Sequence, residues 1–104
     1  MRLLAVVPLL TLSFAAAGAA KATTKTVAID GTTYQPSTLT VKVGEAVTWQ
    51  NKDPFPHTVT SKDAGFDSQP IAAGKSWKYA ATKRGEFSYT CTLHPTMKAT
   101  LRVE

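Results

Sequence analysis

Short β-prone segments separated by turn residues recur from residue 26 to the end of the chain, and they restrict the possible fold more than any other feature. These segments are 26–29, 38–43, 46–50, 57–60, 76–80, 86–90 and 100–103. Residues 38–43 alternate polar with apolar side chains, so Leu39, Val41 and Val43 share one face of the predicted strand. No convincing amphipathic helix is found after residue 25. The spacing of the segments predicts an all-β protein, either an antiparallel β-sandwich or a barrel.

Apolar side chains on these segments supply the expected core. The core candidates are Leu39, Val41, Trp49, Val59, Tyr79 and Phe87. Residues 62–74 instead hold two glycines and a proline among isolated apolar residues. We therefore expect a long loop over 62–74.

The first twenty residues differ in composition from the rest of the chain. Arg2 is followed by the almost wholly apolar stretch 3–14 and by the small residues of 15–20. This order is typical of a secretory signal peptide, with cleavage after Ala19 or Ala20. An uncleaved membrane anchor is the alternative, but the apolar stretch is shorter than the roughly 20 residues of a spanning helix.

We therefore predict a signal peptide at 1–20 and a single periplasmic domain at 21–104. The formal net charge of the whole chain is +5, but its lysines are scattered and form no basic helix. Scattered charge and export both argue against nucleic acid as a partner. After cleavage, no segment remains that would insert stably into a membrane.

Cysteine usage narrows the chemistry of this small domain. A domain of this size often needs a disulfide or a metal for stability. Cys91 is the only cysteine, so an internal disulfide is excluded. Three roles stay open for the thiol: a buried apolar side chain, a disulfide to another molecule, or a metal ligand.

Three side chains that bind metals fall within seven residues near the C-terminus. Cys91, His94 and Met97 offer a thiolate, an imidazole and a thioether. Thiolate and thioether are soft donors that suit copper, and a thiolate, two imidazoles and a weak axial methionine form the blue-copper ligand set. The remaining imidazole must come from His57, the only other histidine. The coincidence predicts that His57, Cys91, His94 and Met97 bind one copper ion.

Prolines flank the predicted histidine ligands. Pro54 and Pro56 precede His57, and Pro95 follows His94. Proline fixes φ and stiffens the chain, and loops at one end of a sandwich cluster together. Stiff loops suit electron transfer, because the ligand geometry then changes little when the metal gains or loses an electron.

Other metals and chemistries fit these residues less well. Structural zinc sites prefer several cysteines, and methionine is a poor zinc ligand. A c-type haem needs a Cys-x-x-Cys-His motif, which the sequence lacks. A nucleophilic pair of Cys91 and His94 has no accompanying oxyanion-hole motif. We therefore predict that the protein is not an enzyme.

The motif Cys91-x-x-His94-x-x-Met97, with Val-Thr-Trp-Gln-Asn at 47–51 and Phe-Pro-His at 55–57, resembles the cupredoxins. This family includes the plastocyanins and the amicyanins, and the spacing around His94 is most similar to that of amicyanins. The resemblance implies an antiparallel Greek-key sandwich of seven or eight strands with a type 1 copper ion near one end. It also implies that His57 comes from a loop between two strands, while the other three ligands share a C-terminal loop.

The sequence departs from the family at one position. Cupredoxins often have asparagine after the first histidine ligand, where it ties the two ligand loops together, whereas this chain has Thr58. Threonine still offers a hydrogen bond, but the bonds around the ligands tune a metal site, so a different redox potential is expected. Asn51 is a candidate for a residue that braces the first loop.

The resemblance implies a soluble carrier of single electrons. His94 would lie near the surface within an apolar patch, and Lys52 and Lys98 beside it would steer an acidic partner. Candidates for the apolar patch are Pro54, Phe55, Leu93 and Pro95. Expected partners are redox proteins, such as a c-type cytochrome or a periplasmic dehydrogenase, that dock briefly on a monomer near His94.

Two other functions stay open. A copper chaperone or copper buffer would use the same donors in an open, exchangeable site, although four ligands in a rigid sandwich impede handover of the metal. An accessory domain of a copper enzyme is a further alternative. A chain of 104 residues leaves no room for a second metal centre or a substrate domain.

Overall fold

The computed structural model describes residues 23–104, and the predicted signal peptide at 1–20 lies outside this range. The described part of the chain contains nine strands. They are β1 (Thr24–Asp30), β2 (Thr33–Gln35), β3 (Thr38–Val41), β4 (Ala46–Asn51), β5 (Thr60–Ser61), β6 (Phe66–Asp67), β7 (Ser76–Ala80), β8 (Gly85–Cys91) and β9 (His94–Val103). Within residues 23–104 no helix is long and apolar enough to cross a membrane.

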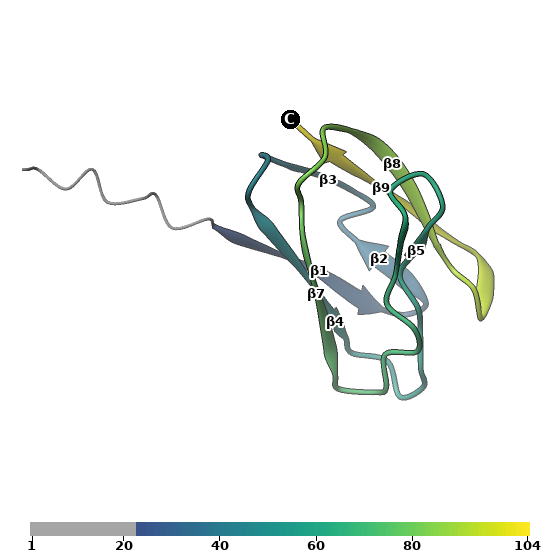
Figure 1. Cartoon of the computed structure of the whole chain (residues 1–104). Helices are drawn as coiled ribbons and strands as arrows, with labels where there is room; N and C mark the ends of the chain where they lie inside the picture. The colour runs from purple at the N-terminus through teal and green to yellow at the C-terminus, as the bar shows by residue number, and fades with distance from the viewer. Residues whose placement is uncertain (1–22) are drawn as a thin grey trace, which may run out of the picture.

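The strands form two sheets, with the orders β2-β1-β4-β7 and β3-β9-β8-β5-β6. Figure 1 shows β1, β4 and β7 in one layer and β3, β8 and β9 in the other. The predicted all-β sandwich is therefore confirmed. Each sheet also holds one parallel pair, β1 with β4 and β3 with β9. Between β1 and β4 the chain crosses to the other sheet, where it forms β3, and then returns. This crossover allows β1 and β4 to run in the same direction.

Several strand boundaries differ from those expected. Two observed strands, β2 and β6, were not predicted, and β6 falls inside the predicted loop 62–74. The strand expected at 57–60 begins only at Thr60, because His57 makes an isolated bridge to Ile71 instead. Strands of two or three residues carry too few side chains for an alternating pattern to be recognised.

The core lies between the two sheets. Of the predicted core residues, Val41, Trp49, Val59 and Phe87 are buried, and Leu39 and Tyr79 are partly buried against them. Val43 was expected on the same face as Val41, but it is 44% exposed. The reason is that β3 ends at Val41 and the chain turns before β4.

Glu45, in the turn between β3 and β4, holds this part of the sandwich together. Its carboxylate accepts hydrogen bonds from the Thr23 hydroxyl and from the Lys42 backbone N–H, the latter at 2.8 Å. These two bonds lower the pKa of Glu45 below its ordinary value of 4.5. The charged form of the side chain therefore stabilises the folded state.

We expect Glu45→Gln to lower the melting temperature at neutral pH and to have a smaller effect in acid. Because the pKa is lower in the folded chain, the carboxylate contributes its full stability above about pH 4.5 and loses it as the pH falls through the folded-state pKa. Thermal unfolding at neutral pH and well below pH 4.5 measures this difference. Glu86→Gln is the control, because Glu86 is 62% exposed and pairs only with exposed Arg102 at 3.4 Å. An equal loss at both pH values for Glu45→Gln would contradict the assignment.

Candidate metal centre

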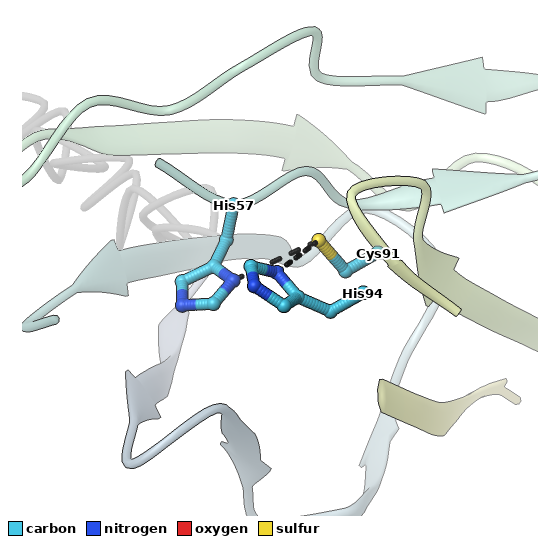
Figure 2. A group of neighbouring side chains, drawn as sticks. All are labelled: His57, Cys91 and His94. Carbon is cyan, nitrogen blue, oxygen red and sulfur yellow. Dashed lines mark hydrogen bonds between the residues drawn. The ribbon is translucent and has the colours of Figure 1, made fainter. Parts of the chain in front are cut away.

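Side chains from two distant parts of the chain meet at one end of the sandwich. His57, Cys91 and His94 each offer one donor atom, and the three atoms lie within 4.8 Å of one another. Figure 2 shows a ring nitrogen of each histidine pointing toward the sulfur of Cys91. The structure therefore brings together three of the four predicted ligands.

The spacing of these three donor atoms fits a single metal ion. A metal lies about 2.0–2.3 Å from imidazole nitrogen and thiolate sulfur, so three donors in one plane around it are roughly 3.5–4 Å apart. The sulfur of Cys91 lies 3.7 Å from Nδ1 of His57 and 3.7 Å from Nδ1 of His94. A thiolate and two imidazoles in this arrangement suit copper.

A tight hairpin between β8 and β9 positions Cys91 and His94. These two residues lie directly opposite each other, joined by the two-residue turn 92–93. The next pair along the ladder is Thr90 with Lys98. The backbone pairing of two strands therefore fixes the relative position of the thiol and the imidazole.

Residues 95–97 form a bulge in β9. Cys91 pairs with His94 and the preceding pair involves Lys98, so 95–97 have no opposite residue on β8. Pro95 suits such a position because it has no N–H to offer to a ladder. Met97, at the end of the bulge, is 3% exposed and belongs to the core. The expected C-terminal ligand loop is thus a bulged strand, with Met97 buried inside the sandwich.

Asp53 orients the ring of His57. Its carboxylate accepts hydrogen bonds from the backbone N–H of Gly31 and Thr32 at 2.7 and 2.9 Å, and lies 2.7 Å from Nε2 of His57. Burial raises the pKa of Asp53, but the bonds from Thr32, His57 and Gly31 outweigh it, so the pKa is lowered overall. With Nε2 donating to Asp53, Nδ1 of His57 is left as the lone-pair donor beside Cys91.

Sequence reasoning missed Asp53. The only available signal was its place four residues before the first histidine, in a loop where aspartate is common. Its main-chain donors come from the turn after β1, which is distant in sequence.

Asn51 braces the loop before His57, as predicted. The side chain is fully buried, and its Nδ2 donates to the carbonyl oxygens of Phe55 and Ile71, both at 2.9 Å. Its Oδ1 accepts a hydrogen bond from the Asp53 N–H at 3.0 Å. One amide side chain therefore fixes the loop that carries both Asp53 and His57.

Thr58 connects the two ligand segments. Its backbone N–H donates to the sulfur of Cys91 at 3.2 Å, and its hydroxyl oxygen accepts a hydrogen bond from the Thr92 N–H at 2.9 Å. The linking role of the family's asparagine is thus filled here by a threonine. The N–H bond also places positive charge density beside the Cys91 sulfur.

We expect Thr58→Val to lower the free energy of unfolding of the metal-free protein by about 1 kcal/mol, because the Thr92 N–H loses its acceptor. Valine keeps the shape of threonine and the main-chain bond to Cys91. Urea unfolding of the metal-free protein measures the change. Thr26→Val, on an exposed position of β1, is the control and should stay within about 0.5 kcal/mol of the native value. Equal stability of the two variants would show that the link contributes nothing.

Exposed apolar residues adjoin His94 in the sequence or in space. Phe55 and Leu93 are 40% and 49% exposed, and His94 is half-buried with its ring centroid 5.7 Å from that of Phe55. Pro54 and Pro95 are exposed too. The predicted exposure of all four patch residues is therefore confirmed. Lys52 and Lys98 are likewise exposed.

Comparison with known protein families agrees with this geometry. A family model for the cupredoxin-like domain matches residues 2–103. Amicyanin of Paracoccus denitrificans is 32% identical over 76 residues, which cover 68% of this chain and 58% of that protein. Plastocyanin of Scenedesmus fuscus is 30% identical over 84 residues, covering 68% of this chain and 86% of that protein. The chain thus spans little more than half of the amicyanin.

Solved structures give the same result. A copper(I) form of an amicyanin variant matches with a TM-score of 0.72 at 30% identity, covering 78% of this chain and 82% of the amicyanin. A copper-containing nitrite reductase from Thermus scotoductus also matches with a TM-score of 0.72, at 29% identity. That match covers 77% of this chain but only 22% of the reductase.

Proposed function

Since this chain belongs to the cupredoxin-like family, we propose that it binds one copper ion and carries single electrons between redox proteins outside the cytoplasm. One observation carries the proposal: His57, Cys91 and His94 place two imidazole nitrogens and a sulfur within 4.8 Å. This is the planar part of the blue-copper ligand set.

In this proposal His57 and His94 would hold copper through Nδ1, Cys91 through Sγ, and Met97 more weakly through its thioether sulfur. Copper supplies a one-electron couple at this site. Cys91 stays deprotonated when bound, and the Thr58 N–H stabilises the negative sulfur. The burial of Met97 and its place beside the paired ligands support its inclusion.

The burial of the donors favours an electron carrier over a copper chaperone or buffer. His57 and Cys91 are fully buried, and Met97 is 3% exposed. A chaperone needs donors that a partner's ligands can reach during handover. The chain is also proposed not to be an enzyme, because its match to a nitrite reductase covers only a fifth of that protein.

Electrons are proposed to leave and enter through His94 and the apolar patch around it. Phe55 and Leu93 offer a small contact area that suits brief docking by a c-type cytochrome or a periplasmic dehydrogenase. Lys52 and Lys98 would attract an acidic partner. We further propose that residues 1–20 direct export, and that 21–104 function as a periplasmic monomer.

The test is to load the metal-free protein with copper(II) and to record its visible spectrum and its electron exchange with a c-type cytochrome. We expect a strong thiolate-to-copper(II) band at one copper per chain, with rapid and reversible reduction. Zinc(II) loading is the matched control and should give no band. A colourless copper complex would rule out the electron carrier. Rapid loss of copper to a chelator would favour the chaperone.

Met97→Ala is expected to leave copper bound while changing the visible spectrum and the redox potential. A weak axial ligand contributes little to affinity but influences the potential strongly. Copper titration and redox potentiometry on the native and Met97→Ala proteins separate the two effects. Complete loss of copper binding in the variant would mean that Met97 is a main ligand rather than an axial one.

A further inference from the structure

A continuous series of aromatic rings crosses the sandwich from the metal centre to the β7 edge. Tyr34 and Tyr89 have ring centroids 4.7 Å apart, and Tyr89 lies 5.5 Å from Trp49. Trp49 lies 5.5 Å from Trp77, whose ring stacks on Tyr79 at 6.0 Å. All five side chains are of the two types that give up an electron most readily, indole and phenol.

The inner end of this series is joined to Cys91. The hydroxyl of Tyr34 donates to the carbonyl oxygen of Thr58 at 2.6 Å, and the N–H of that same residue donates to the Cys91 sulfur at 3.2 Å. Tyr89 precedes Cys91 by two residues on β8, so both side chains point into the sandwich. Both tyrosines are therefore linked to the Cys91 sulfur through short bonded paths.

The outer end reaches solvent at β7, the edge strand of its sheet. Trp77 and Tyr79 are half-buried there, whereas Trp49 is fully buried. The chain contains two tryptophans in all. Of the two indoles, Trp77 is therefore the one that an oxidant in solution can reach.

Within the described part of the chain, two interior members of the series, Trp49 and Tyr89, lack an acceptor for a proton. Tyr89 Oη and Trp49 Nε1 are buried with no hydrogen-bond partner among residues 23–104. Oxidised phenol is normally trapped by loss of its proton, and Tyr89 has no acceptor for it. A missing electron is therefore not held at Tyr89.

We propose that Trp77, Trp49 and Tyr89 form an electron route from the reduced metal centre to the β7 edge, which repairs tryptophan radicals made by one-electron oxidants. The route rests on the proposed copper function. An oxidant removes one electron from Trp77 and leaves a radical cation. Trp49 returns that electron and is itself refilled through Tyr89 and Cys91. The reduced copper centre would supply the electron, and no bond forms or breaks and no proton moves.

The experiment starts the route at a defined point on β7. A ruthenium polypyridyl complex is attached to a histidine introduced by Lys78→His, beside Trp77 in the copper(I)-loaded protein. Light and an added electron acceptor convert the label to ruthenium(III), which oxidises Trp77. Transient absorption then follows the indole radical and the thiolate-to-copper(II) band. Mass spectrometry of the digested protein measures permanent oxidation of Trp77 and Tyr79.

In the labelled protein we expect the indole radical to decay as the copper(II) band rises. Trp49→Phe should lose this fast phase and accumulate oxidised Trp77, because phenylalanine is not oxidised by the label. Trp77→Phe, which changes only the β7 end of the route, should also lose the fast phase. Phe66→Leu is the matched control and should behave as native. The ring centroid of Phe66 lies 6.0 Å from that of Trp49 and 5.6 Å from that of Trp77, but a phenyl ring is not oxidised under these conditions.

The possible failures are distinguishable. If the indole radical decays equally fast in the native and Trp49→Phe proteins, the route is overturned. When both proteins also show a normal copper(II) band in the oxidised state, the proposed copper function still stands. In zinc-loaded protein the Trp77 radical should persist, and its equally rapid disappearance there also overturns the route. A resting protein with no thiolate-to-copper band overturns the proposed copper function, and the route with it.

Discussion

Cys91→Ser is expected to abolish the thiolate-to-copper(II) band and to weaken copper binding by more than the roughly 10–100-fold that loss of an outer hydrogen-bond partner costs. Cys91 supplies the only sulfur at the centre that can carry a negative charge. A serine hydroxyl stays protonated at neutral pH and is a harder donor that suits copper poorly. Copper titration and visible spectroscopy measure both effects.

The matched control for this substitution is Thr90→Ser, one residue earlier on β8 and half-buried. It should keep the band and the copper stoichiometry of the native protein. The metal-free Cys91→Ser protein should also keep its β-sheet circular dichroism, because serine still accepts the N–H of Thr58. A Cys91→Ser protein with an unchanged band would remove the thiolate from the centre altogether.

Asp53→Ala is expected to destabilise the metal-free protein by about 3 kcal/mol, since it leaves three donors without an acceptor. These donors are the N–H groups of Gly31 and Thr32 and the Nε2–H of His57. The ring of His57 also loses the group that holds it, so copper affinity should fall about 10–100-fold. Denaturant unfolding and copper titration measure the two effects independently.

Asp53→Asn separates orientation of the ring from charge. The amide keeps one oxygen for hydrogen bonds but is neutral, so it should recover part of the lost stability. We expect a copper(II) band with a shifted redox potential, because His57 then faces a dipole in place of a carboxylate. Native stability and native copper affinity in Asp53→Ala would show that the aspartate does not position His57.

The meeting of His57, Cys91 and His94 could be predicted from sequence because it depends on side-chain chemistry. A lone thiol, two imidazoles and one thioether in a small β domain have few reasons to occur together except a soft metal. Alternation of polar and apolar residues likewise predicted β7 at its observed bounds, 76–80. In both cases the signal lies in the residue types themselves and does not depend on how the chain is arranged in space.

What the sequence did not predict depends on contacts between distant segments. Asp53 is important only because the turn at 31–32 lies against it. The parallel pairing of β1 with β4 follows from the path of the chain between two sheets, and no residue pattern encodes it. The position of Met97 within a strand depends on the register of β9 against β8.

Because of the bulge at 95–97, the spacing from His94 to Met97 can change independently of the pairing of Cys91 with His94. Cys91 and His94 are joined by a turn of two residues. One residue inserted in that turn would shift the register of β9 against β8 and turn its side chains to the opposite face of the sheet. The bulged residues carry no such penalty, since they already stand outside the ladder. The interval between His94 and Met97 is therefore free to lengthen during divergence, while Cys91 and His94 keep their pairing.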